Sequence, residues 1–172
     1  MILAIDVYYY STKAKAVGVI FEKWNDSRPK EIKSVYLSDI QQYESDNFYK
    51  RELPCIISLL QKIDLSKIEI IIVDSFVYLD DNKKLGLRGY LHEYLEGNMP
   101  ILGVAKNSFH LNKKNVIEVY RGDSKKPLYI SSIGQDLELS AELVRNMHGN
   151  YRFPTILKIL DQETRDIKKN KM

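Results

Sequence analysis

The stretch Ile68–Val73 constrains the fold of this 172-residue chain more than any other feature of the sequence. Five of its six residues are apolar and β-branched, and an acidic residue, Asp74, follows directly. Such a run is typical of a strand that is covered on both faces, as in a parallel sheet with helices on either side. The chain is therefore predicted to be an α/β protein with a buried strand at 68–73.

The segments before this strand predict an antiparallel start. Residues 2–10 and 15–22 are rich in Ile, Val, Tyr and Phe, and the small polar turn Ser11–Lys13 separates them, which is typical of a hairpin. A third strand is expected near 30–38, after the turn-forming residues from Trp24 to Pro29. We expect these three strands to form an antiparallel meander.

Helices and strands alternate in the rest of the chain. A helix is expected at about 50–63, with Pro54 near its first turn or at a bend, and a second at 85–95, which Gly97 and Pro100 end. A short strand at 101–105 ends at Lys106. The remaining expected elements are a hairpin of 116–120 and 128–132 and helices near 137–147 and 154–167. The predicted fold class is an α/β mixed sheet, with three antiparallel strands followed by parallel strands, flanked by helices.

Composition fits a single domain over residues 1–172. A hydrophobic content of 44% is enough to bury a core without disulfides, and the single Cys55 cannot form an intramolecular bridge. No apolar stretch approaches the roughly 20 residues that cross a bilayer, and Asp6 interrupts the apolar start of the chain, so no signal peptide is expected. We expect a cytoplasmic monomer without a membrane partner.

The charge balance permits contact with phosphates without requiring it. The formal net charge is +3, and a basic tail from about residue 167 includes Lys168–Lys171. We interpret this tail as a solvated end of the chain, with contact to a nucleic-acid backbone as the alternative.

Three carboxylates lie where a metal site could form. Asp6 lies inside the first strand, Glu52 near a helix start and Asp74 after the buried strand. Acids in such apolar surroundings are costly to ionise unless a positive charge compensates, and oxygen ligands suit Mg²⁺. In the alternative interpretation, Asp6 faces solvent, Asp74 caps a loop and Glu52 is an ordinary surface acid. Spacing alone leaves both open.

Other catalytic classes find little support in the sequence. It contains no Gly-x-Ser-x-Gly motif, no P-loop and no Gly-x-Gly-x-x-Gly cradle. Its three histidines, His92, His110 and His148, occur without an obvious partner. Phosphodiester cleavage therefore ranks above nucleophilic hydrolysis, nucleotide hydrolysis and dinucleotide binding.

Five segments of the chain, in the same order, resemble motifs of the endonuclease V family. Gly103–Lys106 is the most specific of these resemblances, because it is similar to the family's Gly-Val-Ala-Lys strand. The segments are Ile5–Tyr8, Tyr49–Pro54, Ile72–Asp74, Leu85–Leu87 together with Pro100–Lys106, and Arg152–Asp161. The family has a ribonuclease H-like fold, which the predicted mixed sheet satisfies.

The resemblance implies a nuclease that nicks DNA or RNA 3′ to deaminated bases, chiefly inosine, with Mg²⁺ or Mn²⁺ as the cofactor. It implies that Asp6, Glu52 and Asp74 are metal ligands, that Asp161 completes the acidic cluster and that Lys106 meets the scissile phosphate. The nucleic-acid contacts that it implies come from Tyr43, as the wedge tyrosine that separates strands, from Lys83 and Lys84 at phosphate, and from Gly86 in the base pocket.

Two departures from the family's pattern affect base recognition. The prolines that flank the family's wedge tyrosine are missing around Tyr43, and Ser75–Val77 replaces the Gly-His-Gly of the family. We therefore predict a looser base pocket and weak inosine selectivity. Two alternative functions stay open, namely a structure-selective ribonuclease H-like nuclease and a nucleic-acid-binding module without turnover.

Overall fold

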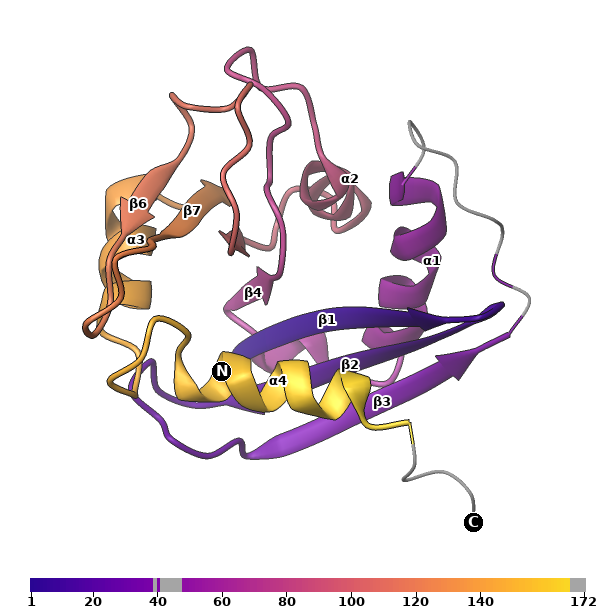
Figure 1. Ribbon diagram of the computed structural model, residues 1–172. Helices are drawn as coiled ribbons and strands as arrows, with labels where there is room; N and C mark the ends of the chain where they lie inside the picture. The colour runs from indigo at the N-terminus through magenta and orange to yellow at the C-terminus, as the bar shows by residue number, and fades with distance from the viewer. Residues whose placement is uncertain (39, 41–47, 168–172) are drawn as a thin grey trace.

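The computed structural model describes residues 1–38, 40 and 48–167, and these residues build a seven-stranded mixed sheet with helices on both faces (Figure 1). The strands run across the sheet in the order β3-β2-β1-β4-β5-β7-β6. Their bounds are β1 Ile2–Tyr10, β2 Lys13–Phe21, β3 Glu31–Leu37, β4 Ile70–Val73, β5 Ile101–Ala105, β6 Ile117–Val119 and β7 Leu128–Ile133.

The pairing of the strands confirms the predicted fold class. β1 pairs antiparallel with β2, which in turn pairs antiparallel with β3, as expected for a meander. β4 then lies parallel to β1, and β5 lies parallel to β4. All four residues of β4 are buried, which agrees with a strand that is covered on both faces.

Two helices cover each face of the sheet. On one face, α1 (Phe48–Leu60) packs against β1, β2 and β3, and α2 (Leu87–Tyr94) packs against β5. On the other face, α3 (Leu137–Arg145) packs against β6 and β7, and α4 (Thr155–Arg165) packs against β1 and β2. Figure 1 shows α4 lying across β1 and β2. The two faces carry separate hydrophobic clusters, so consecutive residues of β1 belong alternately to one cluster and then the other.

Several helix and strand ends differ from the predicted ones for local reasons. α1 begins at Phe48, so Pro54 lies inside the helix rather than in its first turn. It ends at Leu60 because the following turn tightens, with the Lys62 amide donating to the carbonyl of Leu59. A short 3₁₀ helix, η1 (Leu65–Lys67), precedes β4, which begins at Ile70 rather than at the predicted Ile68.

Two predicted features lie outside the described residues, namely Tyr43 and the basic tail beyond Ile167. Within the described part of the chain, no helix combines the length and the apolar character that a membrane crossing requires.

Candidate functional site

Asp6 and Asp74 lie side by side because their strands are parallel neighbours. Ile5 of β1 is in register with Val73 of β4, so the next residue along each chain is an aspartate at the same level of the sheet. Asp6 belongs to the face that α4 covers, since the Thr164 hydroxyl of α4 donates a hydrogen bond of 2.9 Å to its Oδ2. The sheet and α4 together therefore fix where Asp6 lies.

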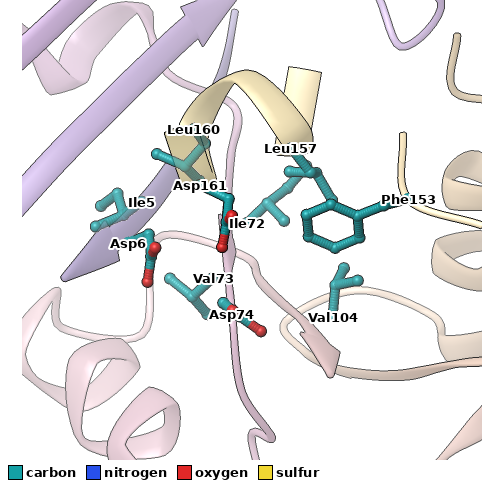
Figure 2. Close-up of a pocket in the computed structure, with 10 residues that line it drawn as sticks. All are labelled: Ile5, Asp6, Ile72, Val73, Asp74, Val104, Phe153, Leu157, Leu160 and Asp161. Carbon is teal, nitrogen blue, oxygen red and sulfur yellow. The ribbon is translucent and has the colours of Figure 1, made fainter. Parts of the chain in front are cut away.

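A small pocket between the sheet and α4 brings three aspartates together. Figure 2 shows Asp6 from β1, Asp74 from the end of β4 and Asp161 from α4 around it, with apolar side chains forming the remaining walls. The apolar residues are Ile5, Ile72, Val73, Val104, Phe153, Leu157 and Leu160. Three of the four predicted acidic residues thus line one pocket.

Lys106 completes this cluster from the end of β5. Its Nζ lies 3.2 Å from Oδ1 of Asp161 and 3.8 Å from Oδ2 of Asp74. The same ammonium group lies 4.4 Å from the centre of the Phe153 ring, which supports it from one side. About a third of the Lys106 side chain is exposed (33%), so its charge is open to a ligand from solvent.

The electrostatics of the pocket favour a bound cation. Burial raises the pKa of Asp74, and the neighbouring carboxylate of Asp6 raises it further, while Lys106 and Arg88 act in the opposite direction. The carboxyl group is therefore harder to ionise than an exposed aspartate. Additional positive charge beside Asp6 and Asp74 would relieve this repulsion.

Glu52, the remaining predicted ligand, has a different partner. It lies on α1, and its Oε1 accepts a hydrogen bond of 3.1 Å from Nη1 of Arg88 in α2. Both side chains are buried. Burial raises the pKa of Glu52, the ion pair with Arg88 opposes that shift, and the Asp6 and Asp74 carboxylates add to it. Glu52 is thus near enough to the aspartates to interact with their charge, but its carboxylate is paired with an arginine.

The donor set of the pocket suits a hard divalent cation. Asp6, Asp74 and Asp161 offer carboxylate oxygens, which Mg²⁺ and Mn²⁺ prefer. Among the described residues, no three acidic, histidine or cysteine side chains lie close enough together to hold an ion without moving. An ion bound there would therefore have to draw the three carboxylates together by rotation of their side chains.

Three of the predicted nucleic-acid contacts, Lys83, Lys84 and Gly86, lie on the segment between β4 and α2, outside the lining of this pocket. Lys83 and Lys84 are exposed there, and Lys83 adopts a positive φ of 61°. Gly86 is the N-cap residue of α2. A Cβ atom on Gly86 would lie 3.0 Å from the carbonyl oxygen of Phe76. Because glycine has no Cβ atom, the backbone at Gly86 can lie this close to the backbone at Phe76.

Two further residues of this loop, Asp81 and Val77, have structural partners. The carboxylate of Asp81 accepts hydrogen bonds from the backbone amides of Lys113 and Lys114, at 2.6 and 2.7 Å, which join the loop to the segment after β5. These amides hold the pKa of Asp81 below its usual range. The Val77 amide donates to Oγ of Ser131, and Val77 is fully buried. The loop is thus held by its own contacts.

Two residues that the sequence reasoning missed contact the site. Thr164 bonds to Asp6, and the guanidinium group of Arg88 lies beside both Glu52 and Asp74, since its Nη2 donates to the backbone oxygen of Asp74 at 2.9 Å. A signal for Arg88 was present, because a charged residue follows Leu85–Leu87 where the resembled motif has alanine. Nothing in the spacing singled out Thr164.

The strand order, the change from antiparallel to parallel pairing at β1 and the acidic pocket where the end of β4 lies beside Asp6 of β1 define a ribonuclease H-like fold. No protein-family model and no curated protein matches the sequence. Solved structures of endonuclease V do share the fold over most of both chains, at low sequence identity.

One of these structures is endonuclease V of Ciona intestinalis in complex with a DNA that contains an inosine, with a TM-score of 0.77, 16% identity, and coverage of 95% of this chain and 83% of that one. Human endonuclease V has a TM-score of 0.72 at 20% identity, covering 95% and 82%. The enzyme of Streptomyces avermitilis has a TM-score of 0.72 at 18% identity, covering 95% and 79%. The shared fold agrees with the family that the five sequence segments resemble.

Proposed function

We propose that this chain is a metal-dependent endonuclease of the endonuclease V type, which hydrolyses a phosphodiester bond in nucleic acid. The observation that carries the proposal is the pocket that Asp6, Asp74 and Asp161 line, with Lys106 beside two of them. The fold shared with endonuclease V structures supports the same class of reaction.

Each residue of the pocket has a role in this proposal. Asp6, Asp74 and Asp161 would hold Mg²⁺ or Mn²⁺, which when bound lowers the pKa of water and stabilises charge on phosphate oxygens. Lys106, partly exposed beside the aspartates, would contact the scissile phosphate as a point charge. The Thr164 hydroxyl holds Asp6 in place through its hydrogen bond.

The proposed substrate is DNA or RNA that contains deaminated bases. Support comes from the Ciona intestinalis enzyme, whose structure holds an inosine-containing DNA. A site that rejects ordinary bases does so by leaving buried polar groups unpaired, which requires rigid walls and close backbone donors. Ser75–Val77 stands where the family has two glycines, so this chain is expected to reject ordinary bases weakly.

The direct test is cleavage of matched inosine and adenine strands, single-stranded and duplex, as DNA and as RNA, with and without Mg²⁺ or Mn²⁺. We expect metal-dependent nicking with less than about tenfold preference for inosine in single-turnover rates, or roughly 1.4 kcal/mol. A preference of a hundredfold or more would show that other residues rebuild the base pocket. Binding of every strand without nicking would leave only the alternative of a binding module.

Lys106→Met tests the proposed phosphate contact. The single-turnover cleavage rate is expected to fall by roughly a hundredfold, because the substitution removes the positive charge beside Asp74 and Asp161 but keeps the length of the side chain. Lys158→Met, an exposed lysine on the same helix as Asp161, serves as the control and should leave the rate unchanged. Equal rates for both variants would remove Lys106 from the proposed site.

A further inference from the structure

Arg88 places a fixed positive charge between Glu52 and the acidic pocket. The residue is 2% exposed. Its Nη1 donates to Oε1 of Glu52 at 3.1 Å, and its Nη2 donates to the backbone oxygen of Asp74 at 2.9 Å. The guanidinium group therefore links α1 to the end of β4.

This pairing determines what Glu52 is free to do. The Glu52 carboxylate could bind a metal ion only through its other oxygen, close to the guanidinium charge, or by giving up the hydrogen bond that its Oε1 accepts from Arg88. A buried arginine without its partner is strongly destabilising, so the ion pair opposes that change. The fixed charge also repels any cation that enters on the Glu52 side of Asp74.

We infer that Arg88 is a positioning residue that keeps Glu52 out of the metal site, so that Asp6, Asp74 and Asp161 alone hold the ion. The inference rests on the proposed function, and it changes the ligand set that the family resemblance implies, in which Glu52 is a ligand. Arg88 thereby supplies, from the protein itself, the positive charge that Glu52 needs in order to be ionised inside the fold.

Calorimetric titration of the full chain with Mn²⁺ tests this ligand set without any measurement of cleavage. Glu52→Gln is expected to change the dissociation constant less than about threefold, because glutamine keeps an oxygen that can accept from Arg88. Asp74→Asn, as the matched loss of one carboxylate charge, is expected to weaken binding by about tenfold or more. Equal weakening by the two variants would overturn the inference while leaving the nuclease proposal in place.

A second measurement uses Arg88→Met, which frees Glu52. Its Tm without metal is expected to fall, since Glu52 is left buried and unpaired. Mn²⁺ should then raise the Tm more in this variant than in the wild-type chain, because Glu52 becomes available as a ligand. The double variant Arg88→Met with Glu52→Leu removes both charges and should lack the additional rise.

The outcomes separate the inference from the proposed function. If the wild-type chain takes up no Mn²⁺ but Arg88→Met does, Arg88 withholds Glu52 but the three aspartates alone do not hold an ion, so both the inferred ligand set and the metal-dependent nuclease proposal fail. If no variant takes up Mn²⁺, both fail. If Arg88→Met and the double variant respond to Mn²⁺ alike, Glu52 is not released and the inference fails alone.

Discussion

Asp74→Asn is expected to reduce metal-dependent cleavage by about a thousandfold or more, equivalent to roughly 4 kcal/mol of transition-state stabilisation, while the protein stays folded. The substitution removes one charge from the pocket that Asp74 shares with Asp6 and Asp161, with almost no change in volume. Single-turnover rates with Mg²⁺ measure the loss. Asp123→Asn, an exposed acid in the turn between β6 and β7, is the control. Full activity in Asp74→Asn would show that any nicking arises elsewhere.

The same substitution should stabilise the protein near neutral pH without metal. A carboxyl group with a raised pKa holds its proton more tightly in the folded than in the unfolded chain, so ionisation of Asp74 lowers stability. This loss is absent at about pH 3, below the unfolded pKa of roughly 3.9, and complete above the folded pKa. Asp74→Asn should therefore raise the Tm at pH 7 but not at pH 3. A lower Tm at pH 7 would mean that attraction to Lys106 outweighs the repulsion.

Gly103→Ala is expected to destabilise the fold by about 2–3 kcal/mol, which lowers the Tm by roughly 4–12 °C in a domain of this size. A Cβ atom at this position of β5 would lie 2.3 Å from the carbonyl oxygen of Ser75 and 2.5 Å from Oγ of Ser131. Backbone directly after Asp74 must therefore shift, and the hydrogen bond from the Val77 amide to Ser131 must lengthen or break.

Thermal unfolding of Gly103→Ala should be compared with that of Gly18→Ala in β2. At Gly18 the atoms nearest to an added Cβ would be the ends of the Leu3, Leu59 and Ile63 side chains, at 3.0 to 3.3 Å, and these can move. We expect the control to change stability by less than about 1 kcal/mol. Equal stability of the two variants would contradict the close approach between β5 and the segment after β4. It would also leave the glycine of the Gly103–Lys106 segment without a structural explanation.

Much of the fold could be predicted because its signals are local. The polar turn at Ser11–Lys13 indicates a hairpin and the apolar run of β4 indicates a buried strand, whatever the rest of the chain does. The predicted elements lie within a few residues of the observed ones. Asp74 and Lys106 come directly after strand ends, and Asp6 lies within β1 beside the end of β4, so the sheet topology alone brings them close. Asp161 was found through a resembled motif.

The partners of buried charges could not be predicted in the same way. Arg88 and Glu52 are 36 residues apart, on two helices whose packing decides which side chains meet. The Glu52 position gives the same sequence signal whether its carboxylate binds a metal ion or an arginine, since both compensate a buried negative charge. The two amide contacts of Asp81 depend likewise on how two loops pack.

The hydrogen bond from Thr164 to Asp6 has a consequence for how the protein is made. It joins residues 158 positions apart, and α4, which carries both Thr164 and Asp161, packs on the first two strands of the sheet. A chain still being synthesised therefore holds Asp6 and Asp74 without the helix that completes their pocket. The proposed nuclease chemistry thus requires α4, and a growing chain that has not yet reached this helix lacks a complete pocket.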